Sequence, residues 1–365
     1  MIAPQFTYSH AEVLQQIERI DPIAYARTRN FVHGSVTYLS PYISRGFISN
    51  QQVMQSLLGR GLKPYQMEKL LQELAWREYW QRVWQQLGNG IMTDIKQNQQ
   101  KVAHRLLPKA LLEANTGITA VDKGIESLLE TGYMHNHLRM YTAAIACNVG
   151  QAHWLAPAQW MYYHLLDGDP ASNHLSWQWV VGSFSSKKYY CNQENINRYT
   201  ATEQTGSYLD TDYDHLPAIA IPLPLVETID AHWHTHLPPT EMPQLDANKP
   251  LLLYNSFNLD PLWHAEEAAN RILLLEPDHF AQFPIGPKVM DFILGLAHNI
   301  PGLQVFSGPV SQLVQTYKGD AILYKEHPTA AHYPGKAESR DWMFPELSGY
   351  YPSFSAFWKK CQRYL

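Results

Sequence analysis

The segment from Thr131 to Trp179 constrains the fold of this chain more than any other part of the sequence. It predicts a helix from Met134 to about Gly150, a turn at Leu155–Pro157 and a second helix over residues 158–166. Polar and charged side chains recur among residues that otherwise have a buried character, namely Asn136, Arg139, Asp167, Asp169 and Asn173. Because buried charges are costly unless they are paired or bound, these residues predict a polar lining in a helical wall. A large planar cofactor with polar edges requires such a lining.

Three short motifs in this segment, MHNHLRM, DGDPASN and WQW, resemble the flavin-binding core of the DNA photolyase/cryptochrome family in the same order and at compatible spacing. The resemblance covers roughly residues 10–200 and implies FAD held non-covalently by an all-helical domain. From the residues alone, Arg139 and Asp167 can also form one buried ion pair in a helical core. The three motifs together, with further motifs upstream, favour the flavin domain.

The length and the charge distribution of the chain indicate how it is organised around this domain. A chain of 365 residues exceeds the usual size of a single core, so two domains are expected. Residues 1–200 carry a net charge of +4 and the remaining 165 a net charge of −9. A mildly basic first part permits contact with phosphate backbones.

Other features of the composition exclude several classes of protein. The sequence has no long apolar run and no signal-peptide pattern at its start, which predicts a cytoplasmic protein without a membrane span. The three cysteines are scattered and form no CxxC pair, so neither a disulfide framework nor a metal site is expected from them.

A second motif lies near the N-terminus, where Ser40 directly precedes Pro41. This pair predicts a helix start, whose free N–H groups suit a phosphate. The resemblance implies that this is the turn that binds the FAD diphosphate, with matching positions at Tyr25, Thr37, Leu39 and Ser40. The family more often has serine where Tyr38 stands, and simple capping of the helix is the alternative.

A long helix is predicted over residues 66–87, with Glu73, Trp76, Arg77 and Trp80 on one face. In the family this segment lines both the flavin and the substrate cavity. The resemblance therefore assigns Glu73 and Trp76 to the substrate and Arg77 to phosphates. A core stripe with Glu73 and Arg77 as an i,i+4 ion pair is the alternative.

The character of the sequence changes after about residue 210. Seven prolines between residues 210 and 250 predict a semi-rigid linker, and its His232-Trp233-His234-Thr235-His236 stretch is expected to be a solvated cluster rather than a metal site. Four short apolar runs then predict buried parallel strands, with a helix between the middle two; these are Leu251–Tyr254, Arg271–Leu275, Leu303–Phe306, Ala321–Tyr324 and the helix Pro287–His298.

The predicted fold is therefore mainly α, with an all-helical FAD-binding domain at residues 1–210, a proline-rich linker at 211–249 and a small parallel α/β domain at 250–365. The role of the α/β domain stays open. The family normally places such a domain before the flavin domain, so the domain order resembles a swap.

The resemblance implies a light-driven lyase reaction. Excited FADH⁻ donates an electron to a cyclobutane pyrimidine dimer flipped out of UV-damaged DNA, and the electron returns after the ring splits. The catalytic residues implied are Glu73, Trp76, Asn136, Met140, Asn173 and Trp179. The cofactor-binding residues implied are Tyr25, Thr37, Leu39, Ser40, Arg77, Asn136, Arg139, Asp167, Asp169 and Asn173. The (6-4) photolyases have histidines at the positions of Asn136 and Met140, so the cyclobutane type is favoured.

Electron transfer to the flavin is assigned to Trp177 and Trp154, although ordinary core packing is an alternative for Trp154. The family's outer aromatic residue has no counterpart in Gln99–Ala103. The competing hypotheses are a cryptochrome-like blue-light-sensing flavoprotein without repair activity and a flavin redox protein without DNA contact. The protein is expected to act as a monomer, without a metal, and the sequence assigns no second, antenna chromophore.

Overall fold

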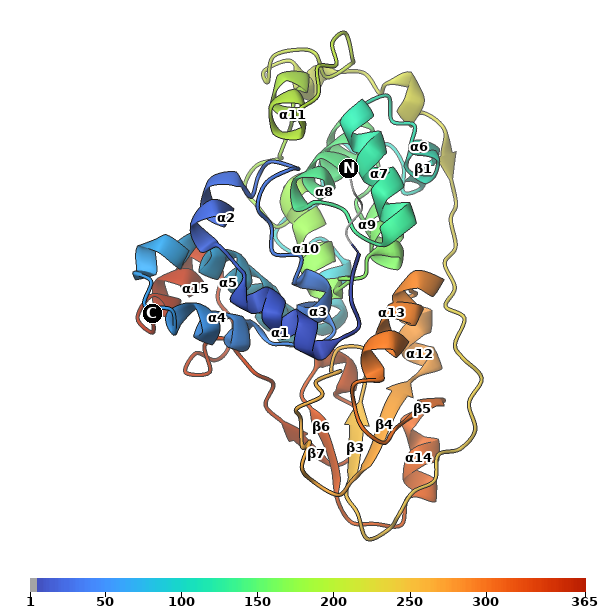
Figure 1. Ribbon diagram of the computed structural model, residues 1–365. Helices are drawn as coiled ribbons and strands as arrows, with labels where there is room; N and C mark the ends of the chain where they lie inside the picture. Colours follow the sequence, from blue (N-terminus) through green and yellow to red (C-terminus); the bar gives the residue numbers. More distant parts are fainter. Residues whose placement is uncertain (1–4) are drawn as a thin grey trace. The chain divides into compact units, whose positions relative to one another are not determined.

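A computed structural model describes residues 5–365 and contains fifteen α-helices and a five-stranded sheet (Figure 1). The chain divides into two compact units. The first consists mainly of Asp21–Val36 and Leu87–Trp233, and the second of Phe6–Ile20, Thr37–Gln86 and His234–Leu365. Among residues 5–365, no helix is both long enough and apolar enough to cross a membrane.

The first unit is helical. Its longest helices are α7 (Thr119–Thr131), α9 (Leu155–His164) and α10 (Pro170–Val181). The shorter helices are α2 (Pro22–Thr28), α6 (Lys109–Glu113), α8 (Asn136–Ala143) and α11 (Gln193–Thr200). Strands β1 (Leu107–Pro108) and β2 (Thr228–Ile229) pair antiparallel, so part of the proline-rich segment is bound to this unit.

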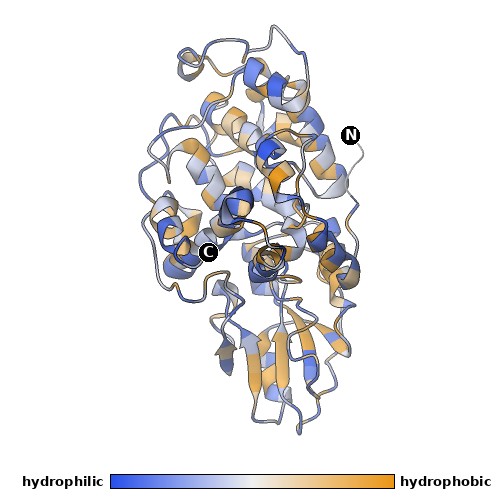
Figure 2. Cartoon of the chain, turned by 60° about the vertical axis from the view of Figure 1, so that its left-hand side comes forward, coloured by the Kyte–Doolittle hydropathy of each residue, from blue (hydrophilic) through white to orange (hydrophobic). Residues whose placement is uncertain are grey.

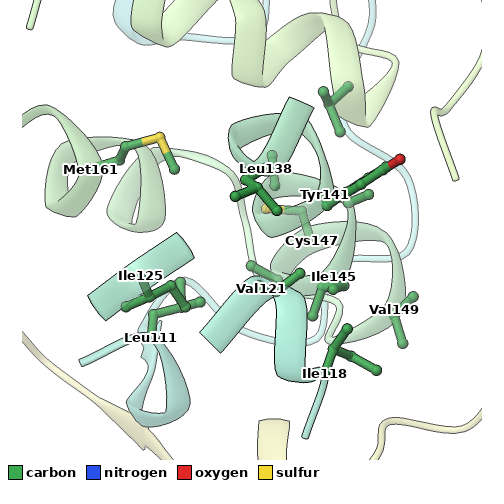
Figure 3. Packing of buried hydrophobic residues seen from close by; sticks show 14 of the residues in the cluster. Leu111, Ile118, Val121, Ile125, Leu138, Tyr141, Ile145, Cys147, Val149 and Met161 are labelled. Atoms are coloured by element: carbon green, nitrogen blue, oxygen red, sulfur yellow. The ribbon is translucent and has the colours of Figure 1, made fainter. Parts of the chain in front are cut away.

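The core of the first unit forms where α7 and α8 cross (Figure 3). On α7, Val121 and Ile125 are fully buried, and on α8, Leu138 is almost fully buried. The apolar residues of α7 recur at helical spacing and therefore lie on one face of the helix. A Cβ atom at Gly124 would lie 2.9 Å from Leu138 Cδ1, so glycine is what permits this close approach.

One helix start differs from the sequence prediction, and one helix end agrees with it. The turn predicted at Leu155–Pro157 is wrong, because α9 begins at Leu155 and Pro157 lies in its first turn. A proline is tolerated there since the N–H groups of a first turn have no intrahelical partner. The helix predicted to end at about Gly150 is α8, which continues as a π-helical turn over Ala144–Val149.

The second unit combines helices with the sheet. Its helices are α1 (His10–Glu18), α3 (Ser40–Ser44), α4 (Asn50–Leu58), nearly all of α5 (Pro64–Leu87), α12 (Pro277–Gln282), α13 (Pro287–Ala297), α14 (Val310–Thr316) and α15 (Phe354–Cys361). The helix predicted over residues 66–87 is α5, and the one predicted over 287–298 is α13. The predicted helix start is confirmed, because α3 begins at Ser40; no side-chain hydrogen bond caps this helix, so the alternative of simple capping is wrong.

The sheet has the strand order β5-β4-β3-β6-β7, and all neighbouring strands are parallel. The strands are β3 (Leu251–Tyr254), β4 (Asn270–Leu275), β5 (Leu303–Ser307), β6 (Ile322–Lys325) and β7 (Lys336–Glu338). Figure 2 shows orange, hydrophobic stretches along several strands of this sheet. The four predicted strands are confirmed as parts of one parallel sheet, and β7 is an additional edge strand.

Side-chain contacts tie several early helices to the C-terminal half of the chain. The fully buried Arg45 donates to Ser256 O and lies 5.7 Å from the Phe257 ring centroid. Arg82 on α5 donates to Phe344 O at 3.1 Å. The two compact units are defined by contacts of this kind. The predicted division at residues 210 and 249 is based on composition and remains a proposal.

Candidate functional site

A buried ion pair lies between α8 and the turn after α9. Arg139 Nη2 is 3.0 Å from Asp167 Oδ2, and the side chains are 20% and 3% exposed. Arg139 Nε also donates to Met134 O at 2.8 Å, and the guanidinium lies 5.6 Å from the Tyr133 ring centroid. The pair predicted from the sequence is therefore present, and its cation is held in one orientation.

The N-terminus of α10 carries Asp169 and Asn173, both more than nine-tenths buried. Asp169 Oδ1 accepts the Ser172 N–H at 2.7 Å and so caps the helix, while Asn173 Nδ2 donates to Ala158 O at 2.8 Å. The bond to Ala158 fixes the amide orientation, and residues 5–365 provide no hydrogen-bond partner for Asn173 Oδ1. Asn173 therefore presents a fixed acceptor oxygen.

Histidines next to these residues add no positive charge at neutral pH. Burial lowers the pKa of His174, His135 and His137 to about 4 in each case. His135 Nδ1 accepts the His137 N–H at 3.2 Å and caps α8, and the His137 ring stacks on Tyr199 at 4.8 Å. Both histidines of the MHNHLRM motif thus have structural contacts.

The predicted substrate residues of the first unit lie closer to solvent. Asn136 is exposed at the first position of α8, and Met140 is half-buried one turn later on the same face. Trp179 is 36% exposed and its ring lies 6.0 Å from that of Tyr189. These three side chains are therefore accessible to a large ligand.

The two tryptophans assigned to electron transfer belong to the hydrophobic core, with Trp177 2% exposed and Trp154 fully buried. Trp154 Nε1 donates to Asp94 Oδ1 at 2.7 Å. Asp94 was not predicted from the sequence, because its partner is 60 residues away and no local pattern connects them.

The second unit holds the other half of the predicted set around α3. Gln16 Nε2 donates to Thr37 O at 2.7 Å, and Leu39 is buried. Tyr38 has a φ angle of 51°, which is uncommon for a bulky residue, so the turn before α3 is held in an unfavourable conformation. Arg77 Nη2 donates to Ser44 Oγ, which ties α5 to α3. Tyr25 is half-buried on α2 of the first unit.

Glu73 and Trp76 are both half-buried on α5. The Trp76 ring is stacked by Phe354 of α15, with ring centroids 3.8 Å apart and planes inclined by 11°. Phe354 was not predicted as a partner of Trp76. The apolar spacing of Phe354, Phe357, Trp358 and Cys361 is the signal that predicts a buried face on α15.

Within residues 5–365, no group of three or more histidine, cysteine, aspartate or glutamate side chains is placed to hold a metal ion.

Comparison with known proteins gives one family match. Residues 70–237 match the family model for the FAD binding domain of DNA photolyase. A deoxyribodipyrimidine photo-lyase of Alkalihalophilus pseudofirmus is 28% identical over 191 residues, which are 49% of this chain and 39% of that protein. The chloroplastic/mitochondrial cryptochrome DASH of Oryza sativa is 25% identical over 209 residues, 53% of this chain and 33% of that protein.

Among solved structures, a cryptochrome of Synechocystis sp. is 21% identical over 54% of this chain and 44% of its own, with a TM-score of 0.47. The chain thus spans less than half the length of these relatives.

The matched segment contains Arg139, Asp167, Asp169 and Asn173, and it is a photolyase-type FAD-binding domain whose cofactor is FAD. The buried donor set fits that cofactor, because it offers one fixed cation, carboxylates and the amide oxygen of Asn173. Residues 70–237 thus carry the FAD-binding domain of DNA photolyase, and the matched relatives support the DNA photolyase/cryptochrome family that the three sequence motifs predicted.

Proposed function

We propose that the protein is a photolyase that uses light to split cyclobutane pyrimidine dimers in UV-damaged DNA. The observation that carries the proposal is the Arg139–Asp167 pair and the fixed amide of Asn173 within an FAD-binding domain. When it is bound and reduced, FAD supplies the electron for this reaction. The protein's own residues have to bind the cofactor and the DNA, orient them and shield them from water.

The first unit supplies the groups proposed to face the isoalloxazine ring. Asn173 Oδ1 is suited to accept the N5–H of a reduced ring, and a neutral amide adds no negative charge there. Arg139 supplies a positive charge that favours an anionic ring, and Asp167 limits its movement. Asp169 is assigned to the ring edge or the ribityl chain.

The second unit supplies the groups proposed for the diphosphate and the lesion. Thr37, Leu39 and Ser40 at the start of α3, together with Arg77, are assigned to the phosphates, as is Tyr25 of the first unit. In the second unit, Glu73 and Trp76 of α5 are assigned to the flipped dinucleotide. In the first unit, the family resemblance assigns the same role to Asn136, Met140 and Trp179. The half-buried or exposed state of these substrate residues supports the assignment.

Replacement of Trp76 by alanine tests the assignment to the lesion. Base–aromatic stacking contributes about 1–3 kcal/mol per base, so Trp76→Ala should weaken binding of UV-irradiated oligothymidylate roughly 5- to 150-fold. Binding of the unirradiated oligonucleotide should hardly change, because phosphate contacts dominate it. Fluorescence anisotropy on both oligonucleotides measures the two affinities.

Two further variants separate stacking from fold effects. Tyr65→Ala removes an exposed aromatic residue from the same helix and should leave both affinities unchanged. Phe354→Ala frees the Trp76 ring and should maintain or strengthen lesion binding. If Trp76→Ala bound irradiated DNA as the wild type does, the lesion site would not include Trp76.

A cryptochrome-like blue-light sensor without repair activity is the second candidate. The observation that favours it is the stacking of Phe354 on Trp76, because the chain's own ring covers a face that a base would need. Unchanged lesion affinity in both Trp76→Ala and Phe354→Ala would support the sensor.

A further inference from the structure

Trp154 has an unusual hydrogen-bond partner for an indole in a core. The residue is fully buried, and its Nε1–H is bonded to the carboxylate of Asp94 at 2.7 Å. A neutral carbonyl would be enough to satisfy a buried indole N–H. A carboxylate does more, because it stabilises positive charge on the indole and can take up the proton.

The surrounding loop fixes this pair. Asp94 Oδ2 accepts the Gln99 N–H at 2.9 Å, and Gln99 Oε1 accepts the Trp154 N–H of the backbone at 2.9 Å. Gln99 Nε2 donates to Ala152 O at 2.8 Å. Gln99, in the segment that lacks the family's outer aromatic residue, therefore holds Trp154 and Asp94 together.

A proton on Asp94 can be released to the solvent. The Asp94 side chain is 14% exposed, and His153 Nε2 lies 3.9 Å from its Oδ2. Burial is the main cause of the lowered pKa of His153, with Arg105 also lowering it and Asp94 raising it. His153 Nδ1 accepts the Leu155 N–H at 3.3 Å, so in the neutral imidazole Nε2 carries the hydrogen and faces Asp94 as a donor. A proton on Asp94 therefore leaves through the exposed part of its own side chain.

The other fully buried tryptophan of the same core lacks such a partner. Trp160 Nε1 has no hydrogen bond within residues 5–365. Trp154 also contacts α10, because its ring lies edge-on to His174 at 5.9 Å, on the helix that carries Asn173 and Trp177. Trp154 is thus the core tryptophan that combines contact with α10 and a proton acceptor.

We propose that Asp94 takes the indole proton of Trp154 when Trp154 loses an electron, so that Trp154 is the last member of the electron-transfer chain. The inference rests on the proposed electron-transfer role of Trp177 and Trp154. One electron leaves Trp154 by way of Trp177 for light-excited oxidised FAD, so Trp154 is oxidised and the cofactor is reduced by one electron. The Nε1–H bond breaks, an O–H bond forms on Asp94, and Trp154 remains as a neutral radical.

This step accounts for the missing outer aromatic residue. A radical that has lost its proton to Asp94 cannot recover the electron until the proton returns, so charge recombination is slowed without a third tryptophan. The exposed edge of the carboxylate then exchanges the proton with water. A surface aromatic residue is not needed to trap the oxidised state.

Asp94→Asn is the decisive variant, because an amide oxygen can still accept the indole hydrogen bond but cannot take its proton. Transient absorption of the FAD-loaded full chain after a light flash distinguishes the neutral tryptophan radical from the protonated one. The wild type should form the neutral radical, with a slower rise in D₂O. Asp94→Asn should retain the protonated radical, lose the D₂O effect and shorten the radical lifetime about tenfold or more.

Control variants distinguish a wrong electron-transfer chain from a wrong role of Asp94. Asp122→Asn alters another half-buried, hydrogen-bonded carboxylate of the first unit and should change neither radical. Thermal unfolding and near-UV circular dichroism check that Asp94→Asn folds normally. If Trp154→Phe formed a tryptophan radical of unchanged yield and lifetime, the electron-transfer chain itself would be wrong. Trp154→Phe could abolish the long-lived radical while Asp94→Asn matched the wild type in the radical's protonation state, lifetime and isotope effect. In that case the electron-transfer chain would be correct, but Asp94 would only position Trp154 and the proposed proton transfer would be wrong.

Discussion

Replacement of Arg82 by alanine should lower the free energy of unfolding by about 3–5 kcal/mol, the cost of breaking a buried ion pair by removing one partner. Arg82 is 5% exposed and its Nη2 donates to Glu78 Oε1 at 3.0 Å, while Glu78 is 3% exposed. The same guanidinium donates to Phe344 O and lies 4.3 Å from the Trp342 ring centroid. Removal would leave both the Glu78 charge and the Phe344 carbonyl without this donor.

The pH dependence identifies the cause of the loss. Burial raises the pKa of Glu78, and Arg82 opposes this rise. In Arg82→Ala the pKa should rise further, so the variant gains stability relative to the wild type as the pH falls and Glu78 takes up a proton. Urea unfolding at several pH values measures this difference, which should be largest above the raised pKa of Glu78.

Paired and distant substitutions serve as controls for Arg82→Ala. The double variant Glu78→Leu/Arg82→Met should recover most of the stability, since an apolar pair of similar volume often replaces a buried ion pair at little cost. Lys336→Ala, at an exposed pair, should leave stability unchanged. A loss in Arg82→Ala that did not vary with pH would rule out an uncompensated Glu78 charge as its origin.

Replacement of Arg139 by alanine should have the second largest effect, because it acts on stability and on the cofactor together. Asp167 is 3% exposed in its side chain and would lose the guanidinium at 3.0 Å. We expect a loss of about 3 kcal/mol, at the lower end for a buried pair because Arg139 is itself 20% exposed. Loss of one charge-assisted contact to the flavin, about 1.5–3 kcal/mol, should also weaken FAD binding roughly 10- to 150-fold.

The two effects are measured separately. Urea unfolding of the flavin-free protein gives the stability term, and titration with FAD followed by flavin fluorescence gives the affinity. Arg139→Ala/Asp167→Asn should regain stability but not affinity, because it removes the buried carboxylate charge without restoring a cation. Lys109→Ala, at an exposed pair of the same unit, should change neither quantity. An Arg139→Ala protein that bound FAD as tightly as the wild type would exclude Arg139 from the flavin site.

Local sequence patterns predicted the regular elements well. Leu251–Tyr254 is a continuous apolar run between Pro250 and Asn255, and β3 occupies those four residues. The helix over residues 64–87 was recognised from its length and from the placement of Glu73, Trp76 and Arg77. The start of α9 was missed because Pro157 is read as a turn residue, although a first helical turn accepts proline equally well.

The partners of the predicted site residues could not be read from the sequence. The motifs identified Trp154 and Trp76, but Asp94 and Phe354 reach them through tertiary contacts that no local spacing encodes. The compact units depend on tertiary contacts of the same kind, since buried contacts such as Arg82 with Phe344 connect distant segments. By contrast, Arg139 and Asp167 were recognised because charges are rare in such an apolar segment and must be paired.

A photorepair assay tests the proposed light-driven repair of DNA by this protein. The purified protein, loaded with FAD and chemically reduced, is mixed with UV-irradiated oligothymidylate and kept in the dark or under blue light. The recovery of thymine absorbance measures the loss of the dimers. The proposed function predicts recovery in the light and none in the dark. Full FAD occupancy and light absorption without any recovery would contradict it and leave the light sensor as the function.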